Sequence, residues 1–211
     1  SASSPNSVYN SEFLPYWRSD SVCSSPRTTH PYFLKMLNSI LIKLDIQHSI
    51  INPFAFSTKR EMVNQFIGYP GFLENIYKTI SCSHPCNGRW EGRTRPENCG
   101  YCYPCLIRQS SLVGQQIPSE HYGNNPLSMQ YLLNATTAKK SDFVDLLNSV
   151  SVAKKSTDND LMRRIKATGK LSQEEVSAFL RLYKATIDDI VQLISVDPEL
   201  TRIVGLAYET D

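Results

Sequence analysis

Three cysteines, Cys99, Cys102 and Cys105, follow one another with two residues between each pair and give the clearest chemical signal in the sequence. Thiolates at this spacing can bind one metal ion, and Gly100 permits the backbone dihedral angles of the tight turn between the first two. A set of four cysteines leaves no coordination position open and therefore indicates a structural Zn²⁺. An iron–sulfur cluster and redox-active or disulfide-bonded cysteines are the alternatives.

A fourth zinc ligand must come from another part of the chain. Cys82 and Cys86 precede Cys99 with 16 and 12 residues between them, and His84 is a further candidate. We favour Cys82 and keep Cys86 as the alternative. The remaining cysteine, Cys23, is expected to be a free thiol, which is the common state of an isolated cysteine.

The elements that position these ligands are expected to begin with a loop, because residues 1–26 are rich in Ser, Pro and Asn. Apolar residues at helical spacing predict a helix over residues 31–44, and residues 46–51 predict a short strand. A turn and the capping box of residues 58–61 then introduce a second short helix. This alternation over residues 28–67 predicts an α/β sheet with a ligand-binding loop after the strand.

The C-terminal part of the sequence has a helical pattern. Helices are predicted over residues 142–152 and 156–167, and Gly169 follows the second as a stop signal. A capping box opens a long amphipathic helix over residues 172–194. The pair at residues 197–198, Asp followed by Pro, ends that helix and starts a short last one.

The composition is that of an ordinary globular chain, with 211 residues, 41% hydrophobic residues and 20% charged residues. The formal net charge of +2 argues against a chain built mainly to neutralise phosphates. No apolar run approaches the roughly 18 residues that a membrane helix needs. No secretory signal is recognised, so we expect a cytoplasmic protein in a reducing compartment, where disulfides are rare.

The segments around the cysteines, residues 81–85 and 98–108, resemble the zinc site of the QueC family. That family comprises 7-cyano-7-deazaguanine synthases and their antiphage-defence relatives such as QatC. The variant at residues 104–108, Pro-Cys-Leu-Ile-Arg, is closer to the QatC-like branch. Residues 26–33 and 52–63 are similar to two further segments of the family, so the resemblance covers about residues 20–115.

The resemblance implies specific site residues. Arg27, Thr28, His30 and Thr58 would bind the substrate, and Lys59, at the start of a helix, would be catalytic by holding a phosphate or carboxylate. The implied fold is the C-terminal part of a PP-loop ATPase-type, Rossmann-like α/β sheet domain with a four-cysteine zinc knuckle. The implied domains are a partial α/β domain over 1–81, the knuckle and a helix over 82–115, and a helical region over 116–211.

The sequence departs from the family in lacking an S-G-G-x-D-S loop, which cradles the phosphates of ATP on backbone N–H groups. This loop is expected to be supplied elsewhere, by an N-terminal PP-loop half or by a companion defence-system subunit. The resemblance implies an ATP-dependent ligase that activates the carboxylate of 7-carboxy-7-deazaguanine, with ATP and Mg²⁺ bound only by the complete enzyme. The activated carboxylate would become a nitrile or amide, or would be attached to a partner protein in antiviral defence.

A second hypothesis from a different class is a zinc-knuckle module that binds protein or RNA and has no catalytic activity. Trp90, with Arg89, Arg93 and Arg95 beside it in the sequence, is typical of a loop that stacks on bases. The weak net charge disfavours nucleic acid as a partner, and no membrane partner is expected.

Overall fold

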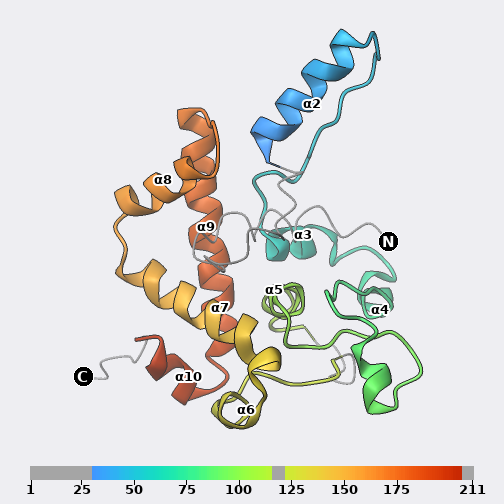
Figure 1. Cartoon of the computed structure of the whole chain (residues 1–211), viewed down its shortest axis with the longest axis vertical. Coiled ribbons are helices and arrows are strands. Elements are labelled where there is room, and N and C mark those ends of the chain that lie inside the picture. The colour runs from blue at the N-terminus through green and yellow to red at the C-terminus, as the bar shows by residue number, and fades with distance from the viewer. Residues whose placement is uncertain (1–29, 116–121, 206–211) are drawn as a thin grey trace.

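The computed structural model describes residues 30–115 and 122–205, and these residues are mainly helical (Figure 1). They contain no strand that belongs to a sheet, and the nearest approach to one is an isolated bridge between Asn98 and Tyr122. The prediction of an α/β, Rossmann-like sheet domain is therefore wrong. The described part of the predicted first domain, residues 1–81, contributes helices instead.

The predicted strand over residues 46–51 shows why the sheet is missing. The segment is extended and exposed, and Ile50 exchanges two hydrogen bonds with the side chain of Asn38, at 2.8 and 2.9 Å. β-branched residues favour an extended backbone, but a strand forms only where a second extended segment lies alongside. The described part of the chain offers no such neighbour to these residues.

The two helices predicted before the cysteines, from residue 31 and after the capping box at residues 58–61, begin where the sequence predicts. Pro31 occupies the first turn of its helix, and Thr58 and Glu61 form both hydrogen bonds of a capping box. In chain order the elements are α2 (Pro31–Lys43), α3 (Lys59–Phe66), α4 (Phe72–Ile76), the 3₁₀ helix η2 (Asn87–Glu91) and α5 (Tyr103–Ser111).

The predicted C-terminal helices are confirmed, with longer bounds in one case. The helix expected at residues 142–152 extends over 137–155, and the capping box at Ser172 is formed. The elements are α6 (Met129–Asn134), α7 (Thr137–Lys155), α8 (Asp158–Ala167), α9 (Gln173–Ile194) and α10 (Pro198–Ile203). None of the described helices is long and apolar enough to span a membrane.

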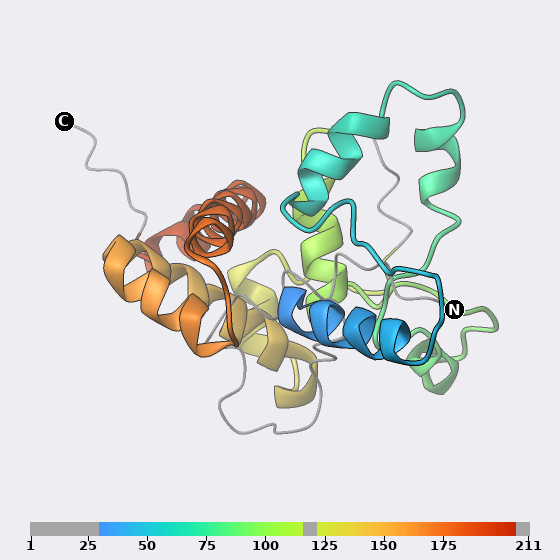
Figure 2. The same cartoon turned by 90° about the horizontal axis from the view of Figure 1, so that it is seen from above.

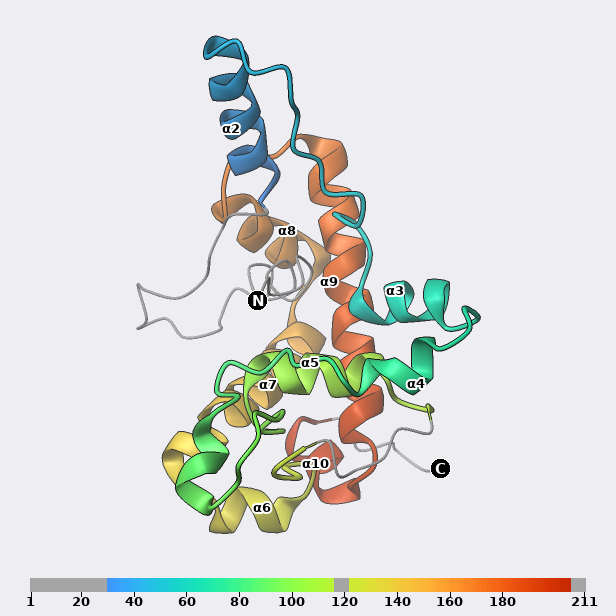
Figure 3. The same ribbon diagram turned by 90° about the vertical axis from the view of Figure 1, so that its right-hand side faces the viewer.

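The long helix α9 is the axis of the hydrophobic core, and α5, α7, α8 and α10 contact it (Figures 1 and 3). Phe179 and Ile190 of α9 and Phe143 of α7 are fully buried. Leu106 and Ile107 of α5 belong to the same core. The helix that follows the cysteines is therefore packed into the core of the helical region.

Helix α2 projects from the rest of the molecule and has no buried residue (Figures 1 and 3). His30 fixes its base, because the ring is buried against Gly169 and Nδ1 accepts a hydrogen bond from the backbone N–H of Tyr32. Lys35 adds an ion pair to Glu175 at the start of α9, at 2.7 Å.

Candidate metal centre

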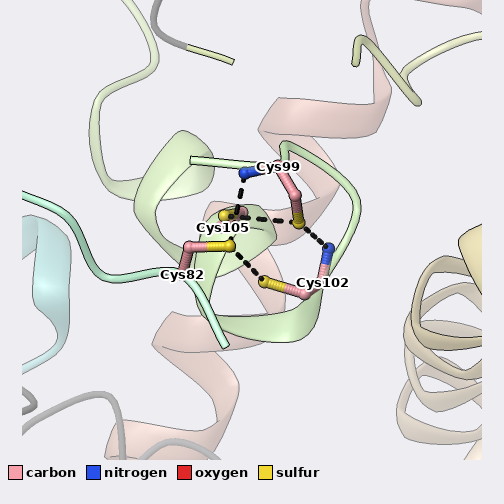
Figure 4. A group of neighbouring side chains, drawn as sticks. All are labelled: Cys82, Cys99, Cys102 and Cys105. Atoms are coloured by element: carbon pink, nitrogen blue, oxygen red, sulfur yellow. Dashed lines mark hydrogen bonds between the residues drawn. The ribbon is translucent and has the colours of Figure 1, made fainter. Parts of the chain in front are cut away.

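Four thiols, those of Cys82, Cys99, Cys102 and Cys105, lie within 4.8 Å of one another (Figure 4). The sulfur atoms of Cys82 and Cys102 are 3.8 Å apart, and those of Cys99 and Cys105 are 4.0 Å apart. A tetrahedral zinc with Zn–S bonds of about 2.3 Å requires sulfur–sulfur separations of about 3.8 Å. The four-cysteine cluster therefore fits Zn²⁺ in both ligand type and spacing.

The cluster is formed by a turn and by the first turn of α5. Cys102 is the N-cap of α5 and Cys105 is its third residue, so the helix directs both thiols to one side. Gly100 has a φ of 89°, and a Cβ atom there would collide with the backbone carbonyl oxygen of Asn124. Asp142 of α7 accepts a 3.0 Å hydrogen bond from the backbone N–H of Tyr103 and so ties this turn to the core.

The structure places the two other candidate ligands outside the cluster. Cys86 is exposed and does not belong to the group of four. The ring of His84 stacks on that of Tyr101, with 6.2 Å between the ring centroids. Cys82, which follows the segment after α4, is therefore the fourth thiol of the group.

Backbone N–H groups surround the sulfur atoms. Cys82 Sγ accepts hydrogen bonds from the N–H groups of His84 and Cys99, at 3.2 and 3.3 Å. Cys99 Sγ accepts one from Cys102, at 3.4 Å, and Cys102 Sγ accepts one from Ser83, at 3.5 Å. Such donors stabilise thiolates and hold them in orientation for a metal.

Contacts among the four thiols shift their pKa values in opposite directions. A hydrogen bond from the thiol of Cys102 lowers the pKa of Cys82, the most exposed member. The hydrogen bond between Cys105 and Cys102, together with burial, raises the pKa of Cys105. Four thiolates at this distance repel one another strongly, so a divalent cation is needed to hold all four ionised.

A cavity of about 380 Å³ lies directly beside the cluster, between α3, α4, α5 and residues 79–81. We call it the α3–α5 pocket; Figure 2 shows α3 and α5 side by side. Most of its wall is apolar and comes from Met62, Val63, Phe66, Phe72, Ile76 and Ile80. Its polar groups are Lys59, Arg108 and the hydroxyls of Thr79, Ser81 and Ser111.

Lys59 and Arg108 make this pocket cationic. Burial, and then the charge of Arg108, lower the pKa of Lys59 to about 8. The guanidinium of Arg108 donates hydrogen bonds to Thr79 Oγ1 at 2.7 Å and to the carbonyl oxygen of Ile76 at 2.5 Å. Within the described residues, no carboxylate forms an ion pair with either cation. An anion bound between them would supply the missing charge.

Two other predicted substrate residues have structural roles in this chain. Thr58 is buried and caps α3, and His30 is buried as the cap of α2 with Nε2 at 3.3 Å from Thr168 Oγ1. Neither lines the α3–α5 pocket. Arg27 and Thr28, and the remaining cysteine, Cys23, lie outside the described residues.

Asn98 was not among the predicted site residues, whereas Arg108 was considered as a residue that could neutralise the cluster or face the site, and it lines the α3–α5 pocket. The Asn98 side chain is buried; it accepts a hydrogen bond from the N–H of Ser81 at 3.1 Å and donates one to the carbonyl oxygen of Thr79 at 3.3 Å. The only signal of Asn98 in the sequence was its position, one residue before Cys99.

Comparisons of the chain with protein-family models, with curated proteins and with solved structures found no match. What the site can do is therefore inferred from its own geometry. Four thiols can hold a structural metal, and the adjoining pocket can hold an anionic group on an apolar body.

Proposed function

We propose that this chain is the zinc-bearing portion of an ATP-dependent ligase of the QueC and QatC type. The ligase would activate the carboxylate of 7-carboxy-7-deazaguanine, and the S-G-G-x-D-S nucleotide loop would be supplied by another polypeptide segment. The carboxylate attacks the α-phosphorus of ATP and pyrophosphate leaves. A nitrogen nucleophile, from ammonia or from a protein terminus, then displaces AMP.

The observation that carries this proposal is the pair of cations, Lys59 and Arg108, in an apolar pocket next to the four-cysteine cluster. A flat heterocycle with a carboxylate combines apolar faces with one negative charge. The apolar wall excludes water from those faces, and the two cations neutralise the charge. The pocket volume of about 380 Å³ falls in the range of small-molecule sites.

The chain's own residues would bind and orient the substrate rather than activate the nucleotide. Lys59 stands at the first position of α3, so its ammonium can contact an anion from the rim of the pocket. Zn²⁺ on Cys82, Cys99, Cys102 and Cys105 would be structural, since four thiolates leave no position for a catalytic water.

The test uses the complex of this chain with the polypeptide that carries the nucleotide loop. AMP release is measured with ATP and 7-carboxy-7-deazaguanine, for the unaltered chain and for Lys59→Ala. We expect AMP release that depends on the deazaguanine acid and that falls at least about tenfold in the variant, as for loss of one charged contact. Lys43→Ala, at the exposed end of α2, is the matched control. Absence of AMP release, or equal rates for Lys59→Ala and the unaltered complex, would refute the proposal.

A second candidate, a binding module for RNA, is favoured by one observation. Trp90 is 80% exposed, and the guanidinium of Arg89 lies 5.3 Å from its ring centroid. Arg93, by contrast, pairs with Glu91 and Glu97 and is not available to phosphates. If this candidate is correct, RNA affinity falls steeply with salt concentration and Trp90→Ala removes it.

A further inference from the structure

The α3–α5 pocket and the four-cysteine cluster share the same two chain segments. The first segment runs from Thr79 and Ser81, whose side chains line the pocket, directly into the ligand Cys82. The second is α5, which bears Cys105 facing the cluster and, one turn later, Arg108 facing the pocket. A displacement of either segment at the cluster therefore displaces a wall of the pocket.

Hydrogen bonds across the two segments make this connection stiff. Arg108 Nη1 donates to Thr79 Oγ1 at 2.7 Å and to Ser81 Oγ at 3.3 Å. Asn98, which directly precedes the ligand Cys99, bonds the backbone of both Thr79 and Ser81. The wall at residues 79–81 is thus held to α5 by polar side chains on one side and by the cysteines on the other.

A bound metal ion would be the strongest of these connections. The other contacts of Cys82 Sγ with the cluster are a 3.8 Å thiol contact with Cys102 Sγ and a 3.3 Å hydrogen bond from the N–H of Cys99, and hydrogen bonds to sulfur are weak. The segment before Cys82 is exposed at Thr79 and Ile80, so few apolar contacts retain it. A metal–thiolate bond at Cys82 would add a strong connection to these weak contacts.

We propose that metal binding at the four cysteines assembles the α3–α5 pocket, so that the metal controls anion affinity by holding Arg108 where it contacts the anion. The ligand class is a carboxylate or phosphate on an apolar body of small-molecule size. The inference depends on the proposed function for the use of this pocket. It goes beyond that function in making the metal a determinant of ligand binding rather than of fold stability alone.

The test measures reciprocal coupling, because a metal that strengthens ligand binding must itself be bound more tightly when the ligand is present. The probe is indole-3-carboxylate, and Zn²⁺ affinity of the full chain is measured by competition with a chelator. We expect saturating probe to raise the Zn²⁺ affinity about five- to tenfold, and Zn²⁺ to raise the probe affinity by the same factor.

Two variants test whether the effect of the probe on Zn²⁺ affinity depends on the pocket. For Arg108→Met, the Zn²⁺ affinity is measured with and without probe, and we expect the variant to lose the increase that the probe causes. Arg95→Met removes the same charge from an exposed position outside the pocket and should retain that increase. An equal increase in both variants would overturn the assignment of Arg108.

Hydrogen exchange tests whether the coupling between probe and Zn²⁺ arises only because the metal-free chain unfolds as a whole. On chelation we expect loss of amide protection over residues 76–82 and 98–105, with protection retained in α7 and α9. Loss of protection throughout the chain would overturn the inference, since any ligand of the folded state would then raise the apparent Zn²⁺ affinity.

Probe binding with no effect on Zn²⁺ affinity would also overturn the inference, while leaving the proposed function intact. Coupling without AMP release by the complex would instead reject the proposed function alone.

Discussion

Arg60 Nε lies 2.8 Å from Asp189 Oδ1, and this ion pair joins α3 to the middle of α9. Both side chains are largely buried. Gln192, one turn further along α9, accepts a 2.5 Å hydrogen bond from Arg60 Nη1, and Arg181 pairs with Glu61 at 2.6 Å. These contacts fix the helix that bears Lys59 to the hydrophobic core, so the position of the pocket depends on α9.

The Arg60–Asp189 pair predicts a pH-dependent stability. Burial raises the pKa of Asp189 from 3.8 to about 6, although the charge of Arg60 opposes the shift. The folded state therefore binds a proton that the unfolded state has already lost between pH 4 and 6, and stability falls as pH rises through this range. We expect the free energy of unfolding of the unaltered chain, relative to Asp189→Asn, to fall by about 2–3 kcal/mol from pH 4 to pH 7.

Urea denaturation followed by circular dichroism at several pH values measures this difference. Asp188→Asn is the matched control, because Asp188 is exposed and pairs with Lys154 at 3.1 Å on the surface. Parallel stability curves for Asp189→Asn and the unaltered chain across pH 4–7 would contradict the prediction.

The four-cysteine cluster predicts one zinc ion for each chain. Native mass spectrometry of the purified protein should show this stoichiometry, and Cys82→Ser should lower the Zn²⁺ affinity at least about a hundredfold, because a ligand is lost outright. Cys86→Ser should leave it unchanged, since Cys86 is exposed and lies outside the cluster. Zinc loss in Cys86→Ser with retention in Cys82→Ser would reverse the assignment of the fourth ligand.

The cysteine spacing predicted the cluster well because metal ligation is a local property. Cys99, Cys102 and Cys105 are close in sequence, so one turn and one helix start bring them together. The same holds for the helix starts at Thr58 and Ser172, whose capping boxes involve residues only three apart.

The fold class could not be predicted in the same way, because a sheet depends on contacts between distant segments. The two helices of the predicted alternation over residues 28–67 form, but the predicted strand does not, because residues 46–51 find no strand to pair with among the described residues. The α3–α5 pocket could not be predicted from the sequence either. Lys59 and Arg108 are 49 positions apart, and only the packing of α3 on α5 brings them together.

The close approach of Gly100 to the backbone of Asn124 predicts that the metal centre requires glycine at this position. In Gly100→Ala, the new methyl group meets the carbonyl oxygen of Asn124, and the residue keeps an unfavourable φ of 89°. We expect a loss of several kcal/mol of stability and weaker zinc binding, because the collision involves backbone that cannot move aside easily. Thermal unfolding and chelator competition measure the two effects.

Gly114→Ala separates the effect of the dihedral angle from that of the collision. Gly114 has a φ of 87°, but a methyl group added there would point into open space, with no neighbouring atom within 4 Å. Its substitution should cost only about 1 kcal/mol and leave zinc affinity unchanged. Equal costs for the two variants would mean that the turn between Cys99 and Cys102 adapts to a side chain.

Lys59 predicts a titration near neutral pH. Its pKa is lowered to about 8 by burial first and by Arg108 second, so Arg108→Met should raise the midpoint. Nuclear magnetic resonance of lysine side chains in the zinc-loaded protein measures this midpoint directly, and Arg95→Met should leave it unchanged.

The folded state loses the Lys59 proton before the unfolded state does, so this site adds stability as pH rises from about 8 toward 10.5. A bound carboxylate would reverse the shift, and indole-3-carboxylate should therefore raise the Lys59 midpoint and cause proton uptake at pH 8. A midpoint near 10.5 in the free protein would place the Lys59 ammonium in solvent and remove it from the pocket.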